Sequence, residues 1–106
     1  MPKYLIQATY TPEGLKGLLR EGGTGRREAL DRMMENIGGR VESFYYAFGE
    51  CDVYVITDVP NNVTAAAVGL TISATGAVRT KTVVLLTTDE IDEAVRQEVA
   101  YRPPGA

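Results

Sequence analysis

Residues 41–57 read VESFYYAFGECDVYVIT, and this stretch decides the fold. Val41 to Phe48 and Val53 to Thr57 are rich in β-branched and aromatic residues, which favour β-strands. Because the short acidic connection Gly49–Asp52 joins them, the two runs predict a β-hairpin. The second run is apolar on both sides, which is typical of a central strand covered on both faces.

A strand and a helix precede this hairpin. Lys3 to Tyr10 alternates between an apolar and a mixed face, which predicts a first strand. Thr11 and Pro12 then begin a helix. The glycine-rich segment 22–25 interrupts it, and because the Gly-Lys-Ser/Thr ending of a phosphate loop is missing, this segment predicts an elbow. Beyond the elbow, Thr24 is expected to cap the next helix, from about Gly25 to Asn36, with an apolar stripe at Ala29, Leu30, Met33, Met34 and Ile37.

Two helices and a strand follow the hairpin. Asn61 or Asn62 caps a helix whose apolar residues are expected along one side, at Val63, Ala66, Ala67, Leu70 and Ala74. Val78 to Leu86 predicts the last strand. Thr87 and Glu90 form a capping-box pattern that begins a third helix, expected to turn Ile91, Ala94, Val95 and Val99 inward. Residues 100–106 end in Pro103-Pro104-Gly105 and predict a non-helical arm, either frayed or lying on a partner chain.

The order of these elements predicts an α+β fold with the ferredoxin-like βαββαβ arrangement and an extra C-terminal helix. The 106 residues form one domain, 1–106, with an antiparallel four-stranded sheet that helices cover on one face only. Alternation along the hairpin places Phe44, Tyr46 and alternate residues of the central strand on the uncovered face. An apolar face of this kind needs a cover, so we expect the chain to pair with itself as a homodimer or higher oligomer.

Composition excludes several classes of function. A net charge of −3 and the lack of a Lys/Arg cluster larger than Arg26-Arg27 argue against nucleic-acid binding. The absence of histidine excludes His-based catalysis and ordinary zinc or haem sites, and a lone cysteine builds no metal site, so we expect no metal and no cofactor. No apolar run is long enough for a membrane helix, and the N-terminus lacks a signal-peptide pattern, so we expect a cytoplasmic protein.

Several short motifs resemble those of a known family. They are Tyr10–Gly14, Gly38-Gly39 before an aromatic strand, Gly49–Asp52 after it, Asp58–Pro60, and Gly76–Thr82. Together they resemble the GYD domain family over about residues 3 to 96, which implies a ferredoxin-like fold related to dimeric α/β barrels. The family's Gly-x-Tyr-Asp-like motif keeps Gly49 and Asp52 here, with Cys51 in the place of tyrosine. The resemblance implies no general catalytic activity.

Asp52 is the first candidate for a functional residue. A carboxylate at the mouth of a central strand is able to act as a base or to hold a donor group of a ligand. The structural alternative is that Asp52 caps the turn by accepting backbone N–H bonds. Cys51 lies between Glu50 and Asp52, whose negative charges disfavour a thiolate, so it is interpreted as a packing residue.

The other candidate ligand-binding residues are Tyr10, Tyr54, Arg79, Thr80 and Thr82. Arg79 and Lys81 share one face of the last strand, where they either bind an acidic group or protect an edge strand from aggregation. Thr80 and Thr82 point to the opposite face, where they either orient a ligand beneath the helices or fill the sheet. The tyrosines suit a pocket or a subunit interface.

Two functions of different class fit these observations. The first is a non-catalytic oligomeric domain that binds a small molecule or serves in assembly. The second, by analogy with dimeric α/β barrels, is a cofactor-independent enzyme such as an isomerase or a monooxygenase-like protein. In that alternative Asp52 acts as the base, and a tyrosine or Arg79 stabilises the developing oxyanion.

Overall fold

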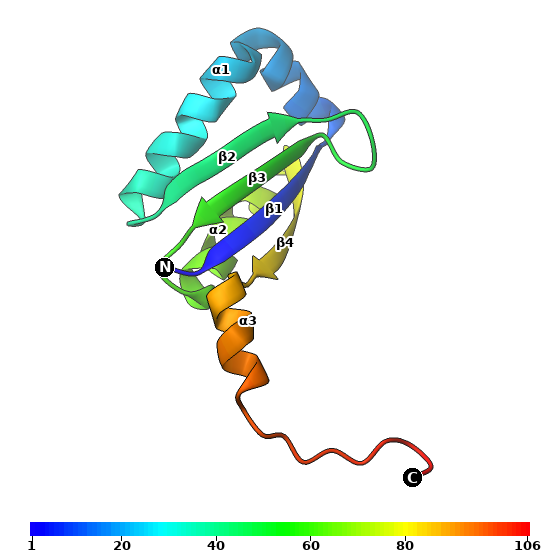
Figure 1. Ribbon diagram of the computed structural model, residues 1–106. Coiled ribbons are helices and arrows are strands. Elements are labelled where there is room, and N and C mark those ends of the chain that lie inside the picture. Colours follow the sequence, from blue (N-terminus) through cyan, green and yellow to red (C-terminus); the bar gives the residue numbers. More distant parts are fainter.

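A computed structural model describes residues 1–106 and contains a four-stranded antiparallel sheet with strand order β2-β3-β1-β4 (Figure 1). The strands are β1 (Lys3–Tyr10), β2 (Arg40–Tyr46), β3 (Val53–Asp58) and β4 (Val78–Leu85). The helices are α1 (Pro12–Asn36), α2 (Asn62–Ala74) and α3 (Thr88–Val95). The order β1α1β2β3α2β4α3 confirms the ferredoxin-like topology with an added C-terminal helix, and β3 is a central strand as predicted.

Side-chain caps begin each helix. Thr11 accepts a hydrogen bond from the backbone N–H of Gly14 at 3.3 Å, and Asn61 accepts one from Thr64 at 2.8 Å. At α3 the predicted capping box is complete, with bonds of 3.1 and 2.9 Å between Thr87 and Glu90. These caps satisfy backbone donors that the first turn of a helix leaves free.

Helix α1 is bent at the predicted elbow. Gly22 has φ 77° and ψ 168°, which breaks the helical conformation between two helical halves. A positive φ of this size is accessible to glycine without a steric penalty. The bend turns the second half of α1 back along the sheet beside β2 (Figure 1).

The hydrophobic core lies between the sheet and the helices. Its buried members are Tyr4, Ile6, Ala8, Met34, Val53, Val55, Val59, Ala65 and Val68. The predicted stripe of α1 packs here, because Met34 is fully buried and Leu30, Met33 and Ile37 pack against the cluster.

The predicted faces of β2 are wrong, because a β-bulge shifts the alternation. Pairing with β3 slips between Val41 and Ser43, so Val41, Phe44 and Tyr46 all face the helices. The guanidinium of Arg27 in α1 lies 5.7 Å from the Phe44 ring, and the Tyr46 hydroxyl donates to the Gly23 carbonyl at 3.1 Å. A bulge adds one residue to one strand, which reverses every side chain beyond it.

The opposite face of the sheet carries no helix, and we call it the open sheet face. Strand register gives it alternate residues from all four strands: Leu5, Gln7 and Thr9; Ser43 and Tyr45; Tyr54 and Ile56; Arg79, Lys81 and Val83. Phe44 and Tyr46, which simple alternation places here, therefore lie on the other face, whereas alternate residues of the central strand, Tyr54 and Ile56, do lie here. Tyr45 is 72% exposed and Val83 38%.

The predicted inward sides of α2 and α3 are also wrong. In α2, Ala65 and Val68 are buried, whereas Val63 and Leu70 are 80% and 72% exposed. Apolar or small residues occupy nearly all sides of α2, so their spacing does not select one face. Every residue from Leu86 to Ala106 is exposed, so α3 buries none of its apolar side chains.

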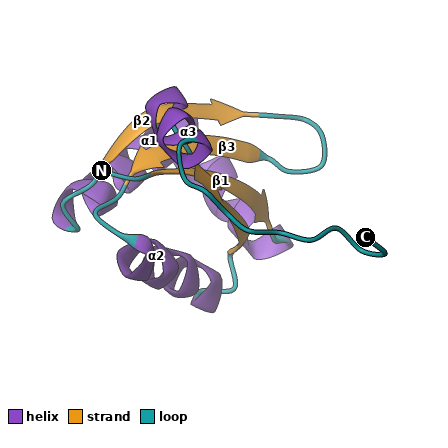
Figure 2. Cartoon of the chain, turned by 60° about the horizontal axis from the view of Figure 1, so that its bottom comes forward, coloured by secondary structure: helices purple, strands orange, loops and turns teal.

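Helix α3 and residues 96–106 lead away from the body of the domain (Figures 1 and 2). As a result the radius of gyration is 17.0 Å, against about 13 Å for a compact domain of this length. No helix is both long and apolar enough to cross a membrane.

Candidate functional site

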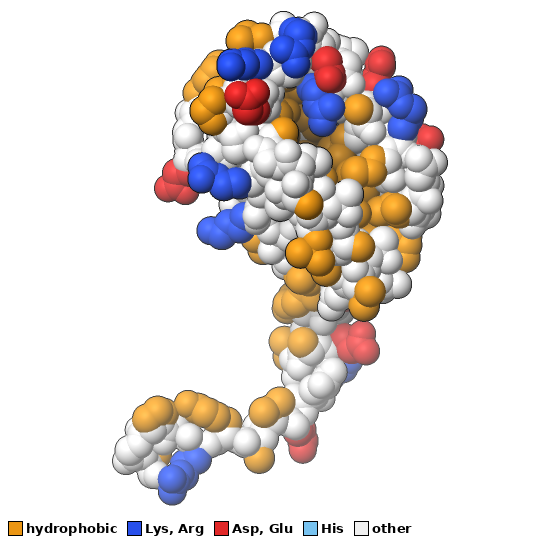
Figure 3. Space-filling model, turned by 180° about the vertical axis from the view of Figure 1, so that it is seen from behind, with side chains coloured by type: hydrophobic (Ala, Val, Ile, Leu, Met, Phe, Trp, Pro, Cys, Tyr) orange, Lys and Arg blue, Asp and Glu red, His pale blue; other side chains and the backbone are white.

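A cavity of about 260 Å³ opens between α1, α2 and the helix-covered face of the sheet, and we call it the inter-helix cavity. Its floor consists of residues from all four strands, and its walls are the second half of α1 and the end of α2. Figure 3 shows hydrophobic side chains gathered in a hollow on this side of the molecule. The cavity exists because α1 packs along β2 while α2 packs along β4.

Eleven of the thirteen residues that line the cavity are hydrophobic. They are Ile6, Ala8, Tyr10, Ala29, Leu30, Met33, Phe44, Val53, Val55, Ile72 and Val78. The other two are Arg26 and Thr80. A mostly apolar lining with few polar groups is typical of small-molecule sites, although this volume is slightly below their usual range of about 300–1,000 Å³.

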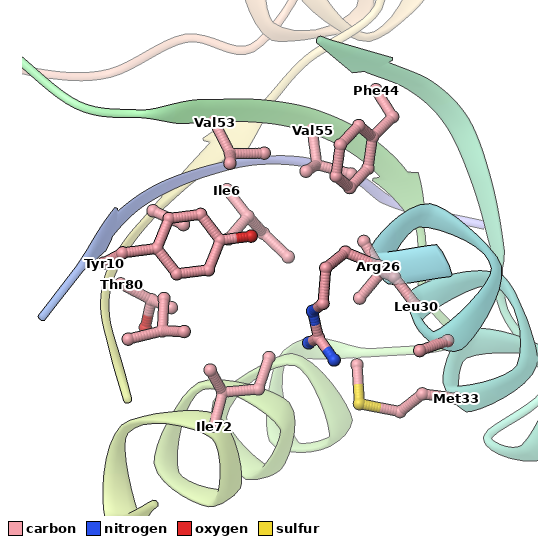
Figure 4. Close-up of a pocket in the computed structure, with 13 residues that line it drawn as sticks. Ile6, Tyr10, Arg26, Leu30, Met33, Phe44, Val53, Val55, Ile72 and Thr80 are labelled. Carbon is pink, nitrogen blue, oxygen red and sulfur yellow. The ribbon is translucent and has the colours of Figure 1, made fainter. Parts of the chain in front are cut away.

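Three polar side chains border the cavity, Arg26 from α1, Tyr10 from β1 and Thr80 from β4. Figure 4 shows the Arg26 side chain entering it from α1, with the Tyr10 hydroxyl directed into the same space from β1. A guanidinium nitrogen of Arg26 lies 3.4 Å from the Glu21 carboxylate, and the two side chains are 37% and 50% exposed. The Thr80 hydroxyl is 3.3 Å from that of Ser73 in α2.

A second tyrosine lies beside this group. Burial and the neighbouring Tyr10 hydroxyl raise the pKa of Tyr46 to about 12, and Arg26 partly opposes the shift. Tyr46 therefore stays protonated near neutral pH and donates its hydrogen bond to the Gly23 carbonyl. This bond ties β2 to the bend in α1, one residue after Gly22.

The structure separates the predicted site residues into groups. Tyr10 and Thr80 line the inter-helix cavity. Thr82 lies on the same sheet face but is exposed and does not line it. Tyr54 and Arg79 lie on the open sheet face, on the other side of the sheet, so they do not share a site with Tyr10.

Asp52 serves a structural purpose in this geometry. One carboxylate oxygen accepts a hydrogen bond from the backbone N–H of Tyr10 at 2.9 Å. The Asp52 carboxylate therefore binds the end of β1, whereas the alternative drawn from the sequence is a hydrogen bond to a backbone N–H of its own turn. It lines a shallower hollow with Tyr10, Tyr46 and Phe48, outside the inter-helix cavity.

The open sheet face has a shallow depression that Arg79 lines and Tyr54 does not. Cys51 is buried there beside Thr9, with Arg79 and Lys81 on the neighbouring strand. The Cys51 thiol raises the pKa of Tyr54. The chain contains no group of three or more His, Cys, Asp or Glu side chains placed to hold a metal ion.

Arg26 is the functional candidate that sequence reasoning missed. From the sequence, the Arg26-Arg27 pair is only a charge cluster too small for nucleic-acid binding. The available signal was spacing, because Arg26 precedes Ala29, Leu30 and Met33 by three, four and seven residues and so shares their helix face.

A family model described as the GYD domain matches residues 4–95, which cover most of the chain. No curated protein and no solved structure matches. The matched range contains the whole inter-helix cavity and all four strands except Lys3, the first residue of β1.

Proposed function

The chain belongs to the GYD domain family, and from the geometry of its cavity we propose that it is a non-catalytic, homo-oligomeric domain that binds a small, largely apolar molecule. The observation that carries the proposal is the inter-helix cavity, with eleven hydrophobic lining residues around one guanidinium and one threonine hydroxyl. Concave sites with a mostly apolar lining and a few polar groups are the usual binding sites of small molecules.

The geometry gives less support to an enzyme that uses Asp52 as its base. The Asp52 carboxylate is engaged by the Tyr10 amide, and it is not among the residues that line the inter-helix cavity. Arg79, the suggested oxyanion partner, is on the opposite face of the sheet. A protein that only binds a ligand does not need Asp52 or Arg79 to contact a reacting atom, so their positions are compatible with it.

Self-association is the second part of the proposal. The open sheet face carries apolar side chains from every strand, and Ile91, Val95, Val99 and Tyr101 are 46% to 81% exposed along the protruding C-terminal segment. A radius of gyration well above that of a compact domain fits a chain whose outlying parts pack on another copy. Apolar surface of this extent favours association.

Native mass spectrometry of the protein purified from its own source tests the ligand. We expect a small-molecule mass that stays with the folded chain and is lost on denaturation. Ala29→Phe, which fills the cavity from α1, should abolish the extra mass, whereas Ala74→Phe on the exposed end of α2 should not. A molecule retained equally by Ala29→Phe would contradict binding in the cavity.

A further inference from the structure

We propose that the inter-helix cavity selects an organic anion, a small apolar molecule with one carboxylate, and that Arg26 binds this carboxylate. The inference rests on the proposed function, because it names the chemical class of the molecule that the cavity takes.

The Arg26 guanidinium has unused hydrogen-bonding capacity. Its one hydrogen bond within the chain is the 3.4 Å contact with Glu21. A guanidinium carries five N–H donors in a planar fork. Arg26 therefore presents several donors to the cavity, and a carboxylate matches such a fork with two parallel hydrogen bonds.

The Tyr10 hydroxyl adds a second polar group at the same place. In Figure 4 it is directed into the space that the Arg26 side chain enters, while Phe44, Leu30 and Ile6 surround that space with apolar atoms. The proposal takes the Tyr10 hydroxyl as the second donor to the carboxylate that Arg26 binds. The two residues come from different elements, α1 and β1, so they fix the position and the orientation of the acid group.

The charge of the cavity restricts the ligand to a single negative group. Among the thirteen lining residues Arg26 is the only cation, and none is acidic. A phosphorylated or multiply charged molecule would bury further charges against hydrophobic side chains, at a high cost in desolvation. A monocarboxylate with an aromatic or alkyl body avoids this cost. A ring fits, since an apolar cavity of about 150 Å³ already accepts benzene.

Glu21 gives the site a resting partner for Arg26. Both side chains are partly exposed, and ion pairs of this kind contribute only about 0–1 kcal/mol. A ligand carboxylate that replaces Glu21 leaves the guanidinium charge paired, so the exchange has a small cost. Glu21 in turn remains at the surface, where water solvates it.

The test compares phenylacetate with phenylacetamide, which has nearly the same shape and no charge, by isothermal titration calorimetry with the full chain at low salt. We expect phenylacetate to bind about tenfold more tightly. Arg26→Gln should remove this preference and leave phenylacetamide affinity within about twofold. Arg26→Lys, which keeps the charge without the fork, should fall between the two. Arg32→Gln, an exposed control on the same helix, should behave as the unaltered protein.

Each outcome supports or overturns a separate claim. Equal binding of the two probes would overturn the anion proposal and leave a general apolar site in place. A preference for phenylacetate that survives in Arg26→Gln, with the thermal midpoint unchanged, would overturn the role of Arg26. An equal loss in Arg32→Gln would assign the preference to overall charge. Binding of neither probe would contradict the proposed function itself.

Discussion

The carboxylate of Asp52 accepts a hydrogen bond from the backbone N–H of Tyr10 at 2.9 Å. The backbone of Asp52 adds two more bonds, since its N–H donates to the Ala8 carbonyl at 2.9 Å and its carbonyl accepts from Ala47 at 2.8 Å. Asp52 thus joins the end of β1 to the loop between β2 and β3. Because Tyr10 ends β1 and lines the cavity, Asp52 positions a residue of the site without entering it.

Asp52→Ala should therefore reduce stability. The Tyr10 amide loses a charged acceptor, and we expect a loss of about 2 kcal/mol in the free energy of unfolding, measured by urea denaturation. Asp52→Asn keeps an acceptor oxygen and should lose less than about 1 kcal/mol. Equal stability of Asp52→Ala and the unaltered protein would contradict the structural role.

Two glycines of α1 should respond to alanine in opposite directions. A Cβ at Gly14 would collide with the backbone carbonyl of Ala77, which also accepts from the Thr11 amide at 3.0 Å. Gly14→Ala should cost about 2 kcal/mol. At Gly17 a Cβ meets nothing within 4 Å, so Gly17→Ala should stabilise by up to about 1 kcal/mol. Thermal melts of the pair measure both effects, and destabilisation by Gly17→Ala would contradict the helix geometry.

An ion cluster across three strands should make stability depend on acid pH. The Asp58 carboxylate is 8% exposed and lies 2.8 Å from the Lys3 ammonium and 2.9 Å from the Arg40 guanidinium. The Lys3 hydrogen bond, aided by the Arg40 charge, lowers the pKa of Asp58. A folded pKa below the unfolded value of about 3.9 stabilises the protein above that value, and the contribution is lost as the pH falls through the folded pKa.

Asp58→Asn should consequently be less stable at pH 7, by about 2 kcal/mol, and should lose less stability than the unaltered protein between pH 5 and about pH 2. Urea denaturation at a series of pH values checks this. Parallel pH curves for the two proteins would show that the Asp58 cluster does not contribute.

Local sequence signals predicted the order of elements well, because each acts over a few residues. The Thr87–Glu90 capping box, the Gly22 elbow and the alternation of β1 all appear where the sequence indicates. Their physical causes are cap hydrogen bonds, a positive φ and burial of one strand face. None of them depends on distant parts of the chain.

Side-chain direction was harder to predict, because it depends on contacts between elements. The register shift between Val41 and Ser43 arises from pairing with β3, and the alternation of apolar and polar residues along β2 does not reveal it. An apolar row on α3 predicts that these side chains are covered, but it does not say whether the sheet of the same chain or another surface covers them. The cavity was predicted only in part for the same reason. Tyr10 and Thr80 were among the candidate ligand-binding residues, whereas Arg26 was not, because the three residues border one cavity only through the packing of α1, β1 and β4.

Self-association should be visible in solution and sensitive to the open sheet face. Light scattering at micromolar concentration should give a mass of at least twice the 11.5 kDa chain. Val83→Lys places a positive charge on that face. A symmetric dimer would contain this charge in both copies, so the measured mass should shift toward that of the monomer. Leu19→Lys, at a position of α1 that is 85% exposed, is the matched control and should leave the mass unchanged. A monomeric unaltered protein would refute the covered-face argument.

Isoleucine methyl spectra test binding in the inter-helix cavity most directly. The chain has five isoleucines, whose methyl signals report on different parts of the molecule: Ile6, Ile37, Ile56, Ile72 and Ile91. Ile6 and Ile72 line the cavity, Ile56 lies on the open sheet face and Ile91 on α3. On titration with phenylacetate we predict large shifts of the Ile6 and Ile72 methyl signals and small ones at Ile56 and Ile91. Shifts at Ile56 or Ile91 with Ile6 and Ile72 unmoved would contradict binding between the helices.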